Sequence, residues 1–298
     1  MLYARGLPCI CSAIANHLVN TFVAYLRQRP TSAVAVALLA AVAAVSLLAP
    51  VIAPHDPNAT NLIRQFEPPS ALSFFGTDEL GRDLFSRVLY GGQTALLTAL
   101  GAVALASIVG IPLGLISGYF GRWVDAVTMR LVDVLLAIPA ILIALGLIAM
   151  FGRGTVNVIV AVGIVNIPAF ARLTRATTLV VKEQDYVHAT QAMGAGYLYL
   201  LGRTILPNAA GPILVQMAVT AATAILLASA LSFLGLGIQP PTSDWGTMLS
   251  IGRQHLFEAP WYGIFPGLAI AMTVYALDEL SRVLQDLLGT HMRAELSL

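Results

Sequence analysis

Few side chains in this sequence are placed to carry out chemistry. A nucleotide-binding P-loop needs a Gly-Lys-Ser or Gly-Lys-Thr step, because its lysine must reach the terminal phosphates. The only lysine, Lys182, stands between Val181 and Glu183, so the sequence contains no such loop. If ATP drives a process here, another chain must bind and hydrolyse it. We therefore do not expect this chain to be an enzyme.

Metal ligands and cofactor-binding residues are equally scarce. Cys9 and Cys11 form a Cys-x-Cys step near the N-terminus, which by itself is a weak metal or redox signal. No further cysteine could complete a four-ligand site, and the five histidines are scattered along the chain. We interpret the two cysteines as passive and expect neither a metal nor a cofactor.

The composition places the chain in a membrane. Of the 298 residues, 58% are hydrophobic and only 10% are charged, and the mean hydropathy is +0.82. A soluble domain usually carries about a quarter charged residues, so these charges could not cover a water-facing surface of this size. The net charge of +1 gives no basic field for nucleic acid.

Six stretches are long and apolar enough to span a bilayer, for which roughly 20 residues are needed. They lie at about 31–53, 93–119, 126–151, 155–173, 211–237 and 262–285. The first is too long for the apolar part of a signal peptide, so we interpret it as a retained transmembrane helix. The expected fold is therefore an all-α membrane protein of six transmembrane helices.

Basic residues predict the orientation of these helices, because Lys and Arg favour cytoplasmic loops. With the N-terminus inside, ten basic residues lie inside and five outside. Both termini are therefore expected to be cytoplasmic. The predicted segments are a cytoplasmic N-terminal segment (1–30), a first helix (31–54), an extracytoplasmic segment (55–92), a five-helix core (93–290) and a cytoplasmic tail (291–298).

Ionisable side chains within spans are candidate functional residues. Arg130 and Asp133 are three apart in the third span, so they can pair on one helix face. The pair could line or gate a pathway, or could be a structural ion pair near the inner interface. We favour the structural interpretation, because the pair follows Arg122 closely. Asp278 and Glu279, in the last turns of the sixth span, are interpreted as meeting the headgroup region.

Small residues recur on one face of the second span. Ala106, Gly110, Gly114 and Gly118 are spaced four apart. Such a face lets the backbone of another helix approach closely, although generic small-residue content could give the same pattern.

The loop at about 184–208 carries the most informative pattern. Residues 184–193 can form a short helix, which Gly194 to Gly196 must break. Residues 197–205 can form a second short helix, stopped by Pro207. Two short helices held at an angle between two spans make a compact, aromatic surface feature, which we call the knob. A knob of this kind suits docking into a groove on another protein.

The knob resembles the EAA loop of binding-protein-dependent ABC importer permeases. Ala189 matches the first alanine of that pattern, Gly194 its glycine, and Leu206-Pro207 its end, with the spacing intact. Two residues depart from it: His188 replaces the glutamate and Thr190 the second alanine. The missing acid puts any particular salt bridge to an ATPase in doubt. The resemblance implies that the knob contacts an ATPase subunit through six residues: Tyr186, Ala189, Gly194, Ala195, Leu206 and Pro207.

Two further motifs narrow the resemblance to the C-type permeases of dipeptide and oligopeptide importers. The first, residues 75–91, resembles the segment before their core helices, and the second, residues 231–249, resembles the segment after their fifth helix. The family implies an ATP-driven peptide importer in a bacterial or archaeal cell (inner) membrane. This chain would form a heterodimer with a sister permease, together with two cytoplasmic ATP-binding subunits and an extracytoplasmic substrate-binding protein.

Other functions remain open at this stage. Similar importers carry glutathione, nickel chelates or haem. An ion-coupled secondary transporter would show paired acids near the bilayer midplane and an internal repeat, which are not evident. A membrane-embedded enzyme would show convergent reactive residues within the spans, and no histidine lies deep in one. Asn157 and Asn166 in the fourth span could be interhelical hydrogen-bonding residues or pathway residues.

Overall fold

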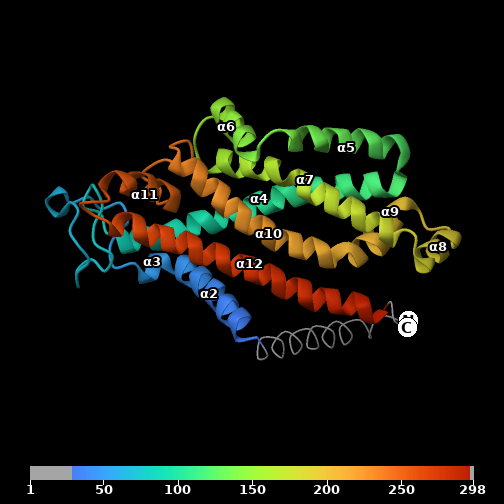
Figure 1. The fold of residues 1–298 in the computed structure, drawn as a ribbon, viewed down its shortest axis with the longest axis horizontal. Helices are drawn as coiled ribbons and strands as arrows, with labels where there is room; N and C mark the ends of the chain where they lie inside the picture. Colours follow the sequence, from blue (N-terminus) through green and yellow to red (C-terminus); the bar gives the residue numbers. More distant parts are fainter. Residues whose placement is uncertain (1–28, 296–298) are drawn as a thin grey trace, which may run out of the picture.

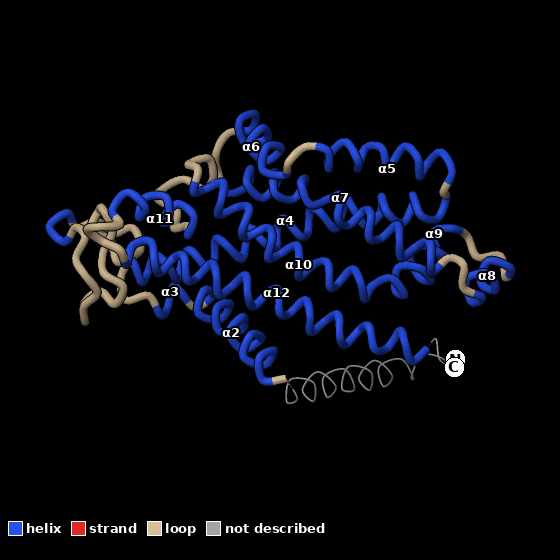
Figure 2. The backbone as a smooth tube through the Cα atoms, in the orientation of Figure 1, coloured by secondary structure: helices blue, strands red, loops and turns tan. Residues whose placement is uncertain are grey.

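The computed structural model describes residues 29–295, which fold as a bundle of helices (Figures 1 and 2). No β-strand occurs in this range; a single isolated bridge joins Thr77 and Asp83. The longer helices are α2 (Pro30–Leu47), α4 (Leu84–Phe120), α5 (Arg122–Ala137), α6 (Ala140–Phe151), α7 (Thr155–Val181), α10 (Leu206–Phe233) and α12 (Trp261–Glu295). The shorter helices are α3 (Ala49–Ile52), η1 (Leu62–Arg64), α8 (Asp185–Ala192), α9 (Tyr197–Tyr199), η2 (Leu200–Ile205), α11 (Trp245–Gly252) and η3 (Arg253–His255).

Five of these helical stretches are long and apolar enough to cross a membrane. They are Pro30–Leu47, Leu84–Phe120, Thr155–Val181, Tyr197–Phe233 and Trp261–Leu288. A sixth span exists if α5 and α6, which are bent by 89° relative to each other, count as one. The prediction of an all-α membrane fold is therefore confirmed. Several spans are longer than the sequence suggested: α4 begins at Leu84 and α7 ends only at Val181.

The third span is broken, although its sequence predicted one continuous helix over 126–151. The break falls at Ile138 and Pro139, between α5 and α6. Proline has no backbone N–H, and its ring disfavours the helical conformation in the residue before it. Ile138 is accordingly extended, with φ −101° and ψ 132°. The chain turns sharply here instead of crossing in one line.

Helices α4 and α7 form the closest pair in the bundle, along the predicted small-residue face. Gly110, Gly114 and Gly118 of α4 all face α7: a Cβ added at Gly114 would lie 2.5 Å from the Ala171 carbonyl oxygen. Ala106, on the same face, is fully buried. Within a membrane, helices associate mainly through close packing, and small residues allow their backbones to approach each other. The prediction of a close helix contact at this face is confirmed.

The bundle has two distinct ends, which Figure 1 shows at left and right. The segment before α4 and helix α11 lie at one end, and α8 and α9 lie at the other. Helix α2 packs along α12: the Ser32 hydroxyl donates to a Glu279 carboxylate oxygen at 2.7 Å, and Arg29 pairs with Asp286 at 2.8 Å. Helices α5 and α6 lie on the opposite side of the bundle from α2 (Figure 1). We call the two ends the α11 end and the α8 end.

Candidate functional site

The knob protrudes from the α8 end (Figure 1). Helix α8 agrees with the predicted first short helix to within one residue at each end. It is fixed to the bundle through Val187, which is only 2% exposed. Tyr186, Ala189 and the other residues around Val187 are mostly exposed. This part of the knob is therefore exposed on the surface of the chain.

Gly194 sets the direction of the chain after α8. Its φ of +86° lies in the left-handed region that side chains disfavour, and its amide donates to the Gln191 carbonyl at 2.9 Å. The Ala195 amide donates to the Thr190 carbonyl at 3.4 Å, and Ala195 is half-buried. The predicted break at Gly194 to Gly196 is present in the structure.

The second predicted helix of the knob does not stop at Pro207. Residues 197–205 instead run on into α10, so that Tyr197–Phe233 is one continuous helical stretch. Residues Leu200–Ile205 form a π-helix, which ends two residues before Pro207. Pro207 cannot donate a backbone hydrogen bond, and its ring crowds the preceding turn. The wider π turn accommodates both effects. Pro207 is exposed, whereas Leu206 packs against the buried cluster of Phe170, Ala209 and Ile213.

Contacts at the base of the knob connect it to three spans. The Lys182 ammonium, at the end of α7, donates to the Gly118 carbonyl of α4 at 3.0 Å. Arg175 of α7 forms a two-pronged ion pair with Asp125 of α5, in which Nη2 lies 2.5 Å from Oδ2. The Ser117 hydroxyl of α4 donates to the same carboxylate at 2.5 Å. These contacts tie the end of α7, from which the knob follows, to α4 and α5.

At the α11 end, buried charges hold the segment before α4 in place. Asp78 is fully buried, and it accepts a bond from Arg82 Nε at 2.7 Å and lies 3.3 Å from Arg87 Nε. Glu79 pairs with Arg82 at 2.8 Å and accepts a hydrogen bond from the Tyr262 hydroxyl of α12. Asp83 caps α4, accepting from the Ser86 amide at 2.9 Å. These charged residues belong to the segment predicted to be extracytoplasmic, and the structure shows that they form a network of ion pairs and hydrogen bonds.

The two motifs at 75–91 and 231–249 meet at this end. The Trp245 indole donates to the Val88 carbonyl at 2.9 Å, and its ring lies against Gly91, where a Cβ would come within 2.6 Å. Asp244 caps α11 by accepting from the Thr247 amide at 2.8 Å. Burial raises the pKa of the Asp244 carboxyl, and the hydrogen bonds from Thr247 oppose that rise. Both motifs are recognisable in the sequence, but their contact is visible only in the structure.

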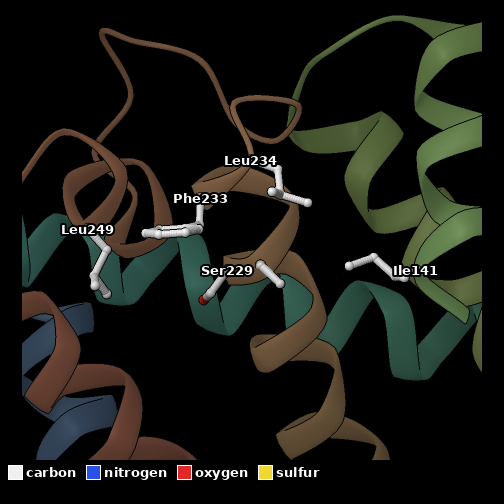
Figure 3. A pocket seen from close by; sticks show the side chains of 7 residues that line it. Ile141, Ser229, Phe233, Leu234 and Leu249 are labelled. Atoms are coloured by element: carbon white, nitrogen blue, oxygen red, sulfur yellow. The ribbon is translucent and has the colours of Figure 1, made fainter. Parts of the chain in front are cut away.

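An apolar pocket lies between α6, α10 and α11 (Figure 3). Its volume is about 380 Å³. In Figure 3, Ile141 of α6 borders it on one side and Leu249 of α11 on the other, with Ser229 and Phe233 of α10 between them. No ionisable side chain lines it. This pocket can therefore accommodate apolar groups but offers no partner for a charge.

The predicted pair of Arg130 and Asp133 does not form. Asp133 instead accepts from Arg172 Nη2 of α7 at 2.6 Å, because the neighbouring helix brings a guanidinium closer than the adjacent turn does. Glu279 lies near both Ser32 and Arg282. Asp133 and Glu279 therefore each contact another helix, which spacing along one helix does not reveal, whereas the Glu279–Arg282 pair lies within α12.

The two asparagines of α7 behave differently. Asn157 Nδ2 donates to the Phe151 carbonyl at 2.9 Å and to the Gly152 carbonyl at 3.0 Å, which joins α7 to the end of α6. Asn166 bonds only the Val162 carbonyl of its own helix, at 2.8 Å. Among the described side chains, residues 29–288, no cluster of three or more His, Cys, Asp or Glu could hold a metal ion; Cys9 and Cys11 lie outside this range.

Comparison with known families gives two matches along the chain. Residues 110–294 match the binding-protein-dependent transport system inner membrane component. Residues 19–69 match the N-terminal TM domain of oligopeptide transport permease C. Together the two matches cover both the first span and most of the later ones.

Similar proteins of named systems cover most of the chain. The probable D,D-dipeptide transport system permease protein DdpC of Escherichia coli K12 is 39% identical over 263 residues, which are 88% of each chain. The di/tripeptide transport system permease protein DppC of Pseudomonas aeruginosa is 41% identical, covering 83% of this chain and 84% of that protein. The glutathione transport system permease protein GsiD of E. coli O1:K1 is 44% identical, covering 88% and 86%.

A solved structure has a similar fold. It is the inward-facing MetNI methionine ABC transporter, with a TM-score of 0.57 and 16% identity. The match covers 68% of this chain and 97% of the chain compared. At this identity the likeness concerns the fold alone.

Proposed function

This chain belongs to the binding-protein-dependent transport system inner membrane component family, and we propose that it is the permease subunit of an ATP-driven importer of dipeptides and oligopeptides. The observation that carries the proposal is identity of 38–41% to permeases named for dipeptides or peptides over most of the chain. It would form a heterodimer with a sister permease and provide half of the pathway. Two cytoplasmic ATP-binding subunits would supply the energy, and an extracytoplasmic binding protein would deliver the peptide.

Coupling to the ATPase is proposed for the knob. Tyr186, Ala189, Gly194 and Ala195 would sit in or beside a groove on the ATP-binding subunit, with Leu206 and Pro207 at its base. The exposure of α8 and the contacts that link the knob's base to α4, α5 and α7 support this role. The knob would transmit motion by surface contact rather than by chemistry.

The cytoplasmic side of the membrane is assigned to the α8 end. Both termini would then be cytoplasmic, and residues 55–90 would face outward, to contact the binding protein or cap the pathway. The excess of basic residues inside supports this orientation. So do the contacts of Arg29 and Ser32 with the second half of α12, which place the start of α2 beside the part of α12 that leads to the C-terminus.

Reconstitution tests the proposal. The chain is coexpressed with a sister permease, two ATP-binding subunits and a binding protein, and the complex is placed in proteoliposomes. We expect ATP-dependent uptake of a labelled dipeptide that requires the binding protein. Glutathione is the second candidate, because the relative named for it is 44% identical. Uptake of glutathione with no uptake of any dipeptide or oligopeptide would replace the peptide proposal.

A further inference from the structure

Three ionisable side chains of α5 and α7 are exposed although they lie on helices of the bundle: Arg130 and Asp133 of α5, and Arg172 of α7. Arg172 and Asp133 pair at 2.6 Å, yet their side chains are 53% and 54% exposed. Arg130, three residues before Asp133, is also exposed. Among the side chains that the structure describes, which end at Leu288, it has no hydrogen-bond or ion-pair partner. We call these three residues the charged stripe.

The charged stripe does not lie at the helix ends. Arg172 is nine residues before Val181, the last residue of α7, which corresponds to about 14 Å along the helix. Asp133 is eleven residues after the start of α5 at Arg122, or about 16 Å. Helix α7 is itself long and apolar enough to span a membrane, and α5 forms a span together with α6 when this bent pair is counted as one. The stripe is therefore within the spans, in the half nearer the knob.

Lipid is an unsuitable neighbour for these exposed charges. Ionisable residues within spans face a water-filled cavity or other protein, because hydrocarbon offers no hydrogen bonds to replace hydration. The Arg172–Asp133 pair leaves the stripe with one unmatched charge, the Arg130 guanidinium. A planar guanidinium binds a carboxylate through two parallel hydrogen bonds.

We propose that Arg130, Asp133 and Arg172 line the aqueous pathway, and that Arg130 binds the C-terminal carboxylate of a peptide as it passes. This inference rests on the proposed function. The site is exposed on one side and holds a single free cation, so binding is weak. Weak binding suits a pathway, because a ligand that enters must also leave. The apolar pocket lies beside α6, which belongs to the same bent span. No charged side chain lines it, so it does not compete with Arg130 for the carboxylate.

Cysteine labelling tests the position of the stripe. In a background with Cys9→Ser and Cys11→Ser, Arg130→Cys is compared with Leu131→Cys, its neighbour in sequence, which is 66% exposed on an adjacent face. Both are assembled with the partner subunits in proteoliposomes and treated with a charged, water-soluble methanethiosulfonate. We expect Arg130→Cys to react at least about tenfold faster. Equal rates, or no reaction at Arg130→Cys because the sister permease or lipid covers it, would overturn the proposal.

Uptake kinetics test the carboxylate contact. Apparent KM for a free-acid dipeptide is measured for the wild type, Arg130→Lys and Arg130→Gln. We expect Arg130→Gln to raise KM about tenfold, the equivalent of one charge-assisted hydrogen bond, and Arg130→Lys to stay within about threefold of the wild type. An unchanged KM in Arg130→Gln, or equal losses in both variants, would contradict it. If the wild type imports no peptide, the proposed function fails, whereas the labelling result still decides whether the stripe faces water.

Discussion

A single backbone angle directs the chain out of α8, and it provides a test at the residue scale. Gly194 has φ +86°, whereas Gly196, two residues later, has φ −72°, and neither has a neighbour within 4 Å of an added Cβ. Only the first position requires glycine. An alanine at residue 194 must adopt a left-handed conformation at a cost of roughly 1–2 kcal/mol, or turn the chain elsewhere.

We therefore expect Gly194→Ala to lower peptide-stimulated ATPase activity and uptake several-fold in the reconstituted importer, and the bulkier Gly194→Val to lower them further. Insertion and binding-protein recognition should be unaffected, because the change lies on an exposed surface. Gly196→Ala is the matched control and should behave as the wild type. Normal transport by Gly194→Val would argue against the proposed role of the knob.

Buried charge at the α11 end supports a second residue-scale prediction. Asp78 is fully buried between Arg82 and Arg87, and its Oδ1 also accepts from the Leu80 amide at 2.9 Å. Asp78→Asn would leave the buried Arg87 guanidinium without its carboxylate partner, and Arg82 with Glu79 alone. Breaking a buried ion pair in this way lowers the free energy of unfolding by about 3–5 kcal/mol. We expect a clear fall in the thermal unfolding temperature in detergent. Asp56→Asn, at an exposed aspartate of the same segment, should change it little; equal effects would show that burial is not the cause.

The role of a residue could be predicted from the sequence only where its interactions are local. The break at Gly194 is a property of the backbone at one residue, so residue type predicted it. The partner of Asp133 depended on where α7 passes, and spacing along α5 suggested Arg130 instead of Arg172. The roles of Asp78 and Trp245 likewise depend on contacts between distant segments, which no spacing rule contains.

At the scale of elements, the contact between α4 and α7 depends on the absence of side chains. A Cβ at Gly114 would meet the Ala171 carbonyl oxygen at 2.5 Å and the Thr174 Cβ at 2.7 Å, and backbone atoms cannot move aside cheaply. Gly146 of α6 has nothing within 4 Å of an added Cβ. We expect Gly114→Ala to destabilise the chain by about 1–3 kcal/mol, through overpacking.

The measurement is thermal unfolding of the two variants in the same detergent. Gly146→Ala should be neutral or slightly stabilising, because alanine favours helix more than glycine does. If Gly114→Ala unfolds at the wild-type temperature, the close approach of α4 and α7 is not needed for stability. The small-residue face was recognisable in the sequence because its period of four matches one side of a helix.

Two departures from the predicted elements have a common cause in proline. Pro139 breaks the third span, whereas Pro207 is carried inside a continuous helix with a π turn before it. Sequence marks both positions equally, and the difference arises from the surroundings. Ahead of Pro207 the chain can widen one turn and continue into α10, but at Ile138 it becomes extended and changes direction by 89°. The sequence therefore indicates that a proline can break a helix, but it does not indicate which of these two prolines does so.

At the scale of the whole molecule, the two ends of the bundle must lie on opposite sides of the membrane. The proposed orientation puts the α8 end, with both termini, in the cytoplasm. The wild-type chain carries its own reporters, because its only cysteines, Cys9 and Cys11, belong to the N-terminal segment. In a variant lacking both, Ser297→Cys reports the C-terminus and Ile63→Cys reports the segment before α4, where Ile63 is 95% exposed.

Intact spheroplasts are treated with a membrane-impermeant maleimide before and after permeabilisation. We expect Ile63→Cys to react in intact spheroplasts, since the segment that carries it is too charged for hydrocarbon and would face outward. The wild-type cysteines and Ser297→Cys should react only after permeabilisation, because the excess of basic residues retains those segments inside. Labelling of Ser297→Cys from outside would reverse the topology. It would also move the knob to the side of the membrane where no ATPase could reach it, so the proposed coupling would fail with it.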